Sequence, residues 1–443
     1  MAERKKIKKG LDIPLKGKPS DRITEARMPA LVAIYPDDFP GCIWKAIVKA
    51  GDEIEKGSPL MCDKNNPDIC LVSPAKGTVK EINRGERRHI NFISVETKND
   101  DGSMHDAVVA GDYENDETKL MKNGLWAMMR QRPYDIVPDA AKKPRDIFIT
   151  AFDSSPLAGE ILDDELSKWL EKGIEHLSKM TEGKVYLSVK PGQEITSSVA
   201  EVYVMEGPHP AGNTGTQIAA IKPVNKGETV WTLDAATAAR IGKLMAADKL
   251  DTHTTVAITG PLMKTPRMVR TVIGASIESI IKGEYEPEKG VRIISGNVLT
   301  GIKTPIDGFL HYPYRQITVI EEGDDADEFM GWASVNPKKY SVKHSFPAFL
   351  RGLSKPFDFD ARIKGGKRAM IMSGEYDKVF PFDIYPEYLI KAIMAGDIDR
   401  MEKLGIYEVA PEDFALPEFV DTSKIELQKI VREGLDNLRK ELE

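Results

Sequence analysis

Cysteine is scarce in this chain of 443 residues, and its scarcity limits the metal chemistry that the chain can support. The three cysteines are Cys42, Cys62 and Cys70, and no two of them form a C-x-x-C pair. A four-thiolate zinc site or iron–sulfur cluster needs four such ligands. The seven histidines are scattered and never recur at the i, i+4 spacing of two ligands on one helix face. We therefore expect no metal centre within this chain alone.

Long apolar runs are also missing. No segment approaches the roughly 20 consecutive apolar residues of a membrane-spanning helix. The chain begins Met-Ala-Glu-Arg-Lys-Lys, which lacks the apolar core of a secretory signal. We expect a cytoplasmic location, with any membrane contact made through partners or through the protein surface.

Basic charge is in the minority, because 62 lysines and arginines face 69 aspartates and glutamates, for a net charge of −7. Nucleic-acid binding requires a basic face, so we expect no nucleic-acid partner. The exception is a basic cluster at the N-terminus. It could contact anionic lipid, although lysines that protect a strand edge are the preferred interpretation. The cluster consists of Arg4, Lys5, Lys6, Lys8 and Lys9.

Residues 48–85 contain two similar half-motifs, each with turn residues around a short extended segment. Gly51-Asp52 and Lys56-Gly57 bracket the first segment, and Ser73-Pro74 with Gly77 precede a second one over 78–82. This repeat favours a small flattened β-barrel of two interlocked sheets. It resembles the biotinyl/lipoyl carrier fold, in which a hairpin between the halves presents a modified lysine. Lys64 stands at that place.

Lys64 has two interpretations, a cofactor attachment site or part of an adaptor that kept the fold and lost the cofactor. Carrier hairpins are tight and follow the lysine with small or apolar residues. This hairpin continues Asn65-Asn66-Pro67-Asp68, which favours a wider turn fixed by side-chain hydrogen bonds to its own backbone. The adaptor is therefore preferred.

From about residue 145 the pattern alternates between strands and helices, which is typical of an open, Rossmann-like α/β layer. An apolar stripe predicts a helix over 162–177, and a second helix is expected over 234–247 with Asp234 as its N-cap. Two adjacent strands over 185–205 indicate a mixed sheet. Strands are predicted over 146–151, 185–189, 202–205, 229–233 and, closing the layer, 255–258.

The rest of the chain predicts a small α+β module and then a mainly helical region. Helices are expected over 386–404 and 422–443, the second preceded by a capping box at Ser423 and Glu426. Both apolar stripes are expected to pack in a core, and of the two helices the terminal one is the better candidate for docking another chain. The predicted fold class is therefore α/β multidomain, with four parts: a biotinyl/lipoyl-like β domain (1–105), a Rossmann-like α/β domain (106–259), an SLBB- or ubiquitin-like α+β domain (260–330) and a helical domain (331–443).

One loop, residues 207–217, has the composition of an anion cradle. Its glycines allow close approach of backbone N–H groups, and His209 is held between two prolines. The loop matches neither G-x-G-x-x-G nor G-x-x-x-x-G-K-[ST], so a rigid turn that shapes an interface is preferred. There is also no G-x-S-x-G or H-E-x-x-H motif, and we predict no catalytic residue.

Several phrases occurring in one order make the chain resemble the A subunit of the sodium-translocating NADH:quinone reductase. The similarity runs from the first strand to the C-terminal helices. The phrases are Lys9-Gly10-Leu11-Asp12-Ile13-Pro14, Asp63-Lys64-Asn65-Asn66-Pro67, Ile82-Asn83-Arg84-Gly85, Gly207-Pro208-His209-Pro210-Ala211-Gly212, Thr271-Val272-Ile273-Gly274-Ala275-Ser276, Arg292-Ile293-Ile294-Ser295-Gly296-Asn297-Val298-Leu299 and Arg368-Ala369-Met370.

This resemblance implies a peripheral subunit on the cytoplasmic side of a bacterial inner membrane, in a six-subunit complex that passes electrons from NADH to quinone and exports sodium. The partners would be the other five subunits, above all a polytopic membrane subunit that carries quinone and flavin. NADH, flavins and iron–sulfur centres would belong to other subunits, so no cofactor is expected to bind tightly here and the isolated chain should be inactive. Ubiquinone or menaquinone remains a possible ligand.

The fold is also similar to the NADH-binding flavoprotein subunit of complex I and to the C subunit of the Rnf complex. Those relatives use a glycine-rich flavin loop and cluster cysteines, and neither is present here. Many family members carry cysteines around residues 415–421, where Pro417 and Asp421 stand in this chain, and a histidine in place of Gln217.

The predicted site residues are therefore few. His209, Gly212 and Gly215 form a quinone or anion loop, and Lys64 is a site only if the chain is a lipoyl or biotin carrier. No metal ligand is predicted. A third alternative is a pure assembly adaptor that does not contact quinone.

Overall fold

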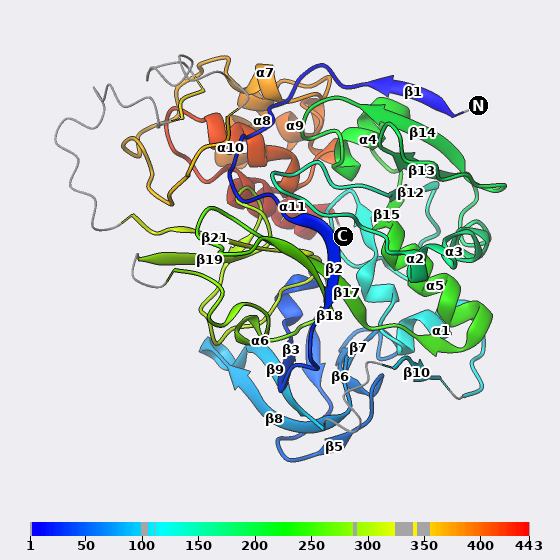
Figure 1. Cartoon of the computed structure of the whole chain (residues 1–443). Helices are drawn as coiled ribbons and strands as arrows, with labels where there is room; N and C mark the ends of the chain where they lie inside the picture. The colour runs from blue at the N-terminus through cyan, green and yellow to red at the C-terminus, as the bar shows by residue number, and fades with distance from the viewer. Residues whose placement is uncertain are drawn as a thin grey trace.

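The computed structural model describes residues 2–98, 105–109, 111–286, 290–323, 340–342 and 355–442. Among these residues, no helix has both the length and the apolar character needed to cross a membrane. These residues form a β-rich N-terminal region, an α/β sheet, a third sheet and a group of C-terminal helices (Figure 1).

The N-terminal region is built from two antiparallel sheets, as the repeat in residues 48–85 predicted. Their apolar faces meet in a core that includes Val32, Leu60, Met61 and Ile93. The first sheet has the order β3 (Leu31–Ile34), β9 (Ile90–Thr97), β8 (Gly77–Arg84), β5 (Glu53–Ile54), and the second the order β4 (Trp44–Ala46), β6 (Pro59–Asp63), β7 (Cys70–Val72).

The α/β part is a six-stranded sheet in which only the last strand is antiparallel, so the prediction of a mixed sheet is confirmed. The reason given for it is wrong, because the two strands over 185–205 pair parallel. The N-terminal strand forms the other edge, where exposed lysines protect it as expected. The order is β1 (Glu3–Lys6), β14 (Glu201–Glu206), β13 (Val185–Val189), β12 (Asp146–Thr150), β15 (Val230–Asp234), β11 (Arg130–Arg132).

Helices cover both faces of this sheet. The apolar side chains of α3 (Leu170–Leu177) and α5 (Ala235–Ala247) pack with Ile147 and Ile149 of β12, whereas Ile218 of α4 (Thr214–Ile221) packs with Phe148 on the opposite face. Asp234 caps α5 as predicted, because its Oδ1 accepts the Thr237 N–H at 2.7 Å.

The single helix predicted over 162–177 is two helices, α2 (Asp164–Ser167) and α3. A short connection, α1 (Asp116–Lys122), follows the N-terminal sheets, and the two-residue strands β10 (Ala107–Val108) and β16 (Lys249–Leu250) pair beside it.

The third sheet includes the strand predicted over 255–258, which was expected to close the α/β layer. That prediction is wrong, since this strand, β17 (His253–Thr259), pairs with β18 and β21 instead. Strand β18 follows β17 after a short loop, so their antiparallel pairing is local. The order is β2 (Ser20–Glu25), β18 (Arg267–Val272), β17 (His253–Thr259), β21 (Gln316–Glu321), β19 (Val291–Ser295), β20 (Ile302–Lys303), with α6 (Ile277–Ile281) beside it.

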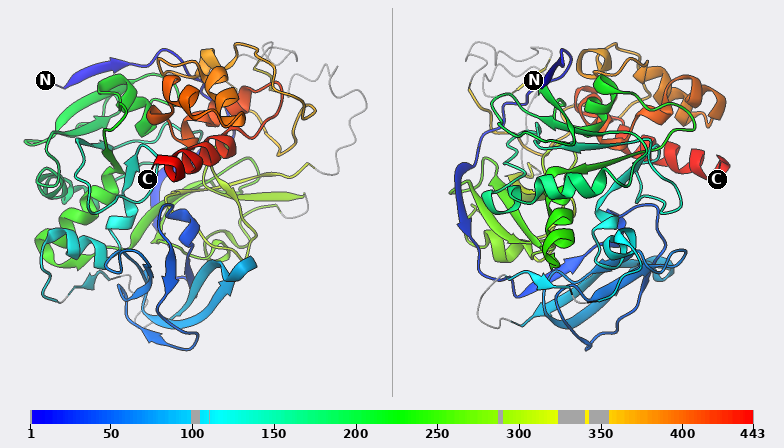
Figure 2. Two further views of the ribbon diagram at one scale, coloured as in Figure 1. Left: turned by 180° about the vertical axis from the view of Figure 1, so that it is seen from behind. Right: turned by 90° about the vertical axis from the view of Figure 1, so that its right-hand side faces the viewer.

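The C-terminal helices are α7 (Tyr376–Val379), α8 (Pro386–Met394), α9 (Ile398–Lys403), α10 (Ala415–Val420) and α11 (Leu427–Leu442). The helix predicted over 386–404 is interrupted at Gly396, which adopts a φ of 67°. The terminal helix α11 lies against the rest of the molecule (Figure 2), with Val431, Leu435 and Leu438 fully buried. The sequence left open whether the apolar edge of this helix packs within the chain or on a partner, and it packs within the chain.

The predicted capping box does not form. Helix α11 begins only at Leu427, after Lys424 has adopted a left-handed φ of 58°. The Ser423 hydroxyl accepts the Ile371 N–H at 3.1 Å and donates to the Ala369 carbonyl at 3.0 Å, so it serves a different segment.

Candidate functional site at the junction of the domains

One cavity lies where the strand order of the α/β sheet reverses. From β12 the chain moves outward to β13 and β14, and then returns to place β15 on the other side of β12. Ligands of open α/β sheets bind at such a reversal, outside the carboxyl ends of the strands. The cavity has a volume of about 440 Å³, and Thr150, Phe152 and Asp153 line it from the end of β12.

Every main part of the fold contributes to the walls of this cavity. The end of β15 supplies Thr232, Leu233 and Asp234, and the start of α4 supplies Asn213 and Thr214. The remaining walls come from the N-terminal region (Asp37, Asp38), β11 (Arg130, Arg132), the third sheet and its loops (Gly296, Asn297, Thr300, Tyr312, Pro313, Tyr314, Arg315, Gln316) and the C-terminal part (Pro411, Glu412, Gln428).

The predicted loop over 207–217 forms one of these walls, with His209 and Gly212 facing the cavity. Three contacts hold it. The His209 N–H donates to Asp12 Oδ1 at 2.9 Å, the Gly212 N–H donates to Ser154 Oγ at 2.8 Å, and Ser154 Oγ lies 3.0 Å from His209 Nδ1. Burial lowers the pKa of His209, although Asp153 and Asp12 oppose this. The imidazole is therefore neutral at neutral pH.

Gly215, the third predicted loop residue, does not line the cavity. It lies in the first turn of α4, directly against the buried carboxylate of Asp413. A Cβ atom at this position would overlap both carboxylate oxygens. Gly215 therefore permits a close approach between α4 and the C-terminal part, which is a packing role rather than contact with a ligand.

Gln217 fixes the loop to the sheet from within. Its side chain is fully buried, and Nε2 donates to Thr150 Oγ1 at 2.9 Å and to the Gly212 carbonyl at 3.2 Å. An amide here ties the carboxyl end of β12 to the loop without a titrating group. These bonds attach the loop to the end of β12 and so fix this wall of the cavity.

Arg132 is a buried cation behind the cavity that sequence reasoning missed. It bonds Asp413 Oδ2 through Nη1 and Glu412 Oε1 through Nη2, both at 2.9 Å. Burial opposes its charge, but Asp413 and Glu412 outweigh that effect and raise the pKa of Arg132. Burial raises the pKa values of both carboxyls, against the attraction of Arg132. The Glu412 side chain remains 42% exposed, toward the cavity.

The cavity lining is acidic overall. Its acidic side chains outnumber the guanidinium groups, even if the carboxyls of Asp38 and Glu412, whose pKa values burial raises, are protonated. The N-terminus of α4 by itself would attract an anion, but this excess of carboxylates opposes a phosphate group. The acids are Asp37, Asp38, Asp135, Asp153, Glu160, Asp234 and Glu412, and the guanidinium groups are those of Arg130, Arg132 and Arg315.

Three polar atoms on the cavity walls lack a hydrogen-bond partner among the residues that the structure describes. They are Ser155 Oγ, Arg132 Nε and Gln316 Oε1, all of them buried. A buried polar atom without a partner costs about 1–3 kcal/mol. All three atoms are themselves shielded from solvent, so they do not face the open part of the cavity.

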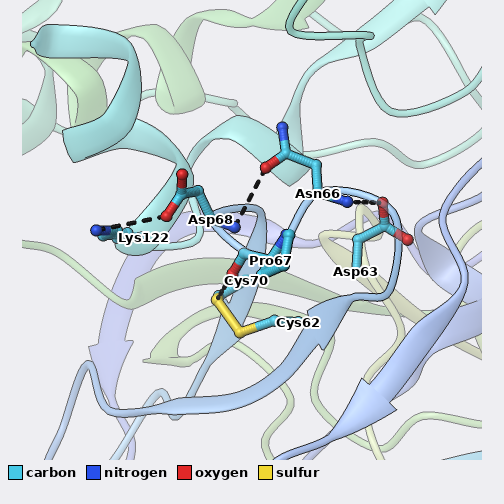
Figure 3. Close-up of a disulfide and its surroundings, with 7 residues drawn as sticks. All are labelled: Cys62, Asp63, Asn66, Pro67, Asp68, Cys70 and Lys122. Atoms are coloured by element: carbon cyan, nitrogen blue, oxygen red, sulfur yellow. Dashed lines mark hydrogen bonds and ion pairs between the residues drawn. A yellow bond between two sulfur atoms is a disulfide. The ribbon is translucent and has the colours of Figure 1, made fainter.

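Lys64 is not among the residues that line this cavity; it lies at the tip of the hairpin between β6 and β7. The tip is fixed as its sequence predicted: the Asn66 N–H donates to Asp63 Oδ2 at 3.0 Å, and the Asp68 N–H donates to Asn66 Oδ1 at 3.2 Å (Figure 3). Asp68 also forms an ion pair with Lys122 at 3.4 Å, so the hairpin contacts α1. The Lys64 side chain itself is exposed.

A disulfide between Cys62 and Cys70 closes the same hairpin (Figure 3). The two residues stand directly opposite each other in β6 and β7. From the sequence these cysteines were weighed only as metal ligands. Their equal distance from the turn at Asn66 was the signal for a cross-strand pair.

Comparisons with known proteins agree on one family. Three family models match the chain: the NqrA N-terminal barrel-sandwich hybrid domain over residues 5–98, the NqrA second alpha/beta domain over 112–250 and the NQRA C-terminal domain over 255–305. The A subunit of the Na(+)-translocating NADH-quinone reductase of Vibrio anguillarum is 37% identical over 98% of this chain and 99% of its own length. Those of Vibrio atlanticus and Neisseria meningitidis are 36% and 34% identical with the same coverage.

The chain belongs to the NqrA family, the A subunits of Na(+)-translocating NADH-quinone reductases.

Asp421 is fully buried; it accepts a hydrogen bond from Tyr376 Oη at 2.9 Å and from the Ile425 N–H at 2.8 Å. This carboxylate joins α7 to the start of α11. Pro417 is buried within α10.

One group of potential metal ligands occurs among the described residues, formed by Asp106, Asp251 and His253. The ammonium group of Lys243 lies 2.8 Å from Asp106 Oδ2 and 2.7 Å from Asp251 Oδ2, so a cation of the chain itself already balances these carboxylates. Burial would raise the pKa of Asp251, but the hydrogen bond from His253, Arg240 and Lys243 together lower it. The group is best described as a charge network that joins Asp106, just before β10, to Lys243 of α5.

Proposed function

We propose that this chain works as the A subunit of a Na+-translocating NADH:quinone reductase, in which electron transfer from NADH to quinone is coupled to sodium export. The observation that carries the proposal is similarity to named NqrA-family proteins over 98% of the chain. The partners would be the other five subunits, and the direct neighbour would be the polytopic membrane subunit. The chain would lie peripherally on the cytoplasmic side of a bacterial inner membrane.

The contribution of this chain would be structural, without a redox centre of its own. A buried and a partly buried charge pair connect the parts of the fold around the cavity. Arg132 joins β11 to Asp413, and Arg315 joins the third sheet to Asp234 of β15 at 2.6 Å. Such pairs fix a geometry, because breaking one leaves a buried charge without a partner. NADH, flavins and iron–sulfur centres would be held by other subunits.

A quinone head group is the ligand whose chemistry suits the cavity. It is neutral, so the acidic walls do not repel it, and a cavity of about 440 Å³ has room for it. We place ubiquinone or menaquinone beside His209 and Gly212 on this basis. Gly215, which faces Asp413, is no longer part of the proposed contact.

A pure assembly adaptor without quinone contact is the main rival to this detail. Photo-crosslinking with a quinone analogue in the intact membrane complex separates the two. Label on peptides that contain His209 or Ser155 supports the quinone site. Label confined to other subunits supports the adaptor and leaves the membership of the complex intact.

A lipoyl or biotin carrier modified at Lys64 is not favoured. The hairpin rests on α1 through the Asp68–Lys122 pair, whereas a carrier hairpin must be free for its modifying enzyme and its active sites. The intact mass of the natively expressed chain tests this point, because lipoylation or biotinylation adds a defined mass to a peptide containing Lys64.

The finer description of the fold is proposed in the same way. The strand order and the two helix-covered faces support a Rossmann-like layer, and the barrel-sandwich match supports a biotinyl/lipoyl-like N-terminal part. The division into four parts at about residues 105, 259 and 330 remains a prediction.

Affinity purification from solubilised membranes tests the proposed function. A tagged chain expressed at its native level should bring down polytopic partners and restore sodium-stimulated NADH:quinone activity to membranes from a deletion strain. Recovery of the chain alone, together with full activity in the deletion strain, would contradict the proposal.

A further inference from the structure

Residues 362–372 form a largely exposed loop that contains both basic and apolar side chains. Ile363, Ile371 and Met372 are 58%, 47% and 39% exposed, although large apolar side chains are usually buried. Between them lie Lys364, Lys367 and Arg368, all exposed, and Arg362 precedes them. Figure 1 shows the loop as a gold coil beside α7 and α10.

The backbone of this loop is held in place from below. Ser423, which is fully buried, accepts the Arg368 N–H through its carbonyl at 3.0 Å and the Ile371 N–H through its hydroxyl at 3.1 Å. Glu426 pairs with Lys367 at 2.7 Å. The two residues of the predicted capping box therefore anchor this loop, and the outward position of its apolar side chains is built into the fold.

One cation of the loop is left over by its ion pairs. Arg362 and Lys364 contact Asp360, at 2.6 and 3.2 Å, and Lys367 contacts Glu426. Arg368 is exposed and has no ion-pair partner among the residues that the structure describes. Its charge is therefore available to an anionic partner, in a chain whose net charge is −7.

We propose that the 362–372 loop docks on the surface of an anionic lipid bilayer, with its cations at the headgroups and Ile363, Ile371 and Met372 inserted between them. This inference rests on the proposed position of the chain at a membrane. Basic residues near an anionic membrane surface are each worth about 1 kcal/mol, and shallow apolar insertion adds to that attraction.

Two observations favour lipid over a protein partner. A stable protein interface buries about 800 Å² on each side, and three side chains on one loop supply far less than that. Cytoplasmic loops of polytopic proteins are themselves rich in lysine and arginine, so they would repel these cations. Lipid phosphates have the complementary charge and do not need an extended matching surface.

Vesicle flotation of the purified full-length chain tests the proposal. The chain should float with vesicles of phosphatidylcholine and phosphatidylglycerol at low salt, and should stay behind with phosphatidylcholine alone or at high salt. The double substitution K367Q/R368Q should weaken binding by roughly 30-fold, about fivefold for each charge. The substitution I371S/M372S should weaken it by roughly tenfold.

The controls are matched pairs on the N-terminal sheets. K45Q/K49Q removes two exposed lysines, and I43S/I47S removes two apolar side chains that are 57% and 52% exposed. Both should bind vesicles as the wild type does. Circular dichroism of each variant reports whether it is folded.

The proposal fails if the folded wild-type chain does not bind anionic vesicles, or if the control pairs reduce binding as much as the loop pairs do. It also fails if the loop variants bind vesicles normally but no longer co-purify with membrane partners, since that result makes the loop a protein-docking site. Co-purification of the wild type is measured separately, so each of these results is distinct from a failure of the proposed function.

Discussion

The hairpin tip at Asp63–Asp68 and the cavity loop at 207–217 are both turn-rich segments, but they are held in different ways. The tip is fixed mainly by its own residues, through Asp63 and Asn66. The cavity loop is held by residues far away in the sequence, among them Asp12, Ser154 and Thr150. A turn that is bonded by its own residues can therefore be predicted from its sequence, whereas a turn held by residues far away in the sequence cannot.

The largest expected effect concerns the remote anchoring of the cavity wall. Arg132→Ala leaves Asp413, which packs against Gly215 of α4, buried without its cation. Breaking a buried pair in this way costs about 3–5 kcal/mol of unfolding free energy. Chemical denaturation measures the loss. The exposed Arg4→Ala control should stay within about 0.5 kcal/mol of wild type, and an equally small effect of Arg132→Ala would show that the anchor is dispensable.

A second expected effect comes from the contact between α4 and Asp413. Gly215→Ala should destabilise the chain by about 1–3 kcal/mol, because the new Cβ overlaps a carboxylate that Arg132 and the Ala410 N–H hold in place. Alanine is the better helix former by about 1 kcal/mol, so a net stabilisation would mean that Asp413 moves freely. Gly366→Ala is the matched control, since open space surrounds that glycine.

The hairpin should respond more weakly, because its bonds are local and its tip is partly exposed. Asn66→Ala removes the acceptor of the Asp68 N–H and should cost about 0.5–1.5 kcal/mol. The exposed neighbour Asn65→Ala serves as the control. The effects of Asn66→Ala and Gly215→Ala should add within about 0.5 kcal/mol in the double variant, because the two sites share no partner. Strong coupling between the two substitutions would show that the hairpin tip and the cavity wall do not respond independently.

The smallest expected effect is a difference in pH dependence. Because burial lowers the pKa of His209, the unfolded chain binds a proton that the folded chain refuses. The stability that this histidine contributes is present above its unfolded pKa of about 6.5 and is lost as the pH falls below that value. Thermal unfolding of His209→Gln should fall less steeply with acid than that of wild type, while Asn66→Ala should keep the wild-type slope. Parallel slopes for His209→Gln and wild type would mean that the fold does not lower the pKa of this imidazole.

The parts of the fold that were predicted correctly carry their signal in consecutive residues. The strands at 146–151, 185–189 and 229–233 are apolar runs of strand length, and Asp234 stands at the one position where it can cap α5. The strand at 255–258 was also found, but its sheet was not. An apolar run shows that a strand is buried and does not show which neighbours bury it.

For the candidate site, most of the important residues could not be predicted from the sequence. His209 and Gly212 were identified because prolines and glycines mark their loop, and both line the cavity. Arg132 and Asp413 are 281 residues apart, and neither is distinguished by its neighbours. Ser423 shows the same limit, because the Ser-x-x-Glu spacing of a capping box is used here to hold a different segment. Residues whose roles depend on remote partners leave no local pattern.

The absorption spectrum of the purified full-length chain tests most directly the claim that it serves in the complex without a redox centre of its own. The isolated chain should show protein absorption alone, without flavin or iron–sulfur bands, while the complex purified through the same tagged chain should show both. A flavin band in the isolated chain at a stoichiometry near one would mean that the chain carries a redox centre.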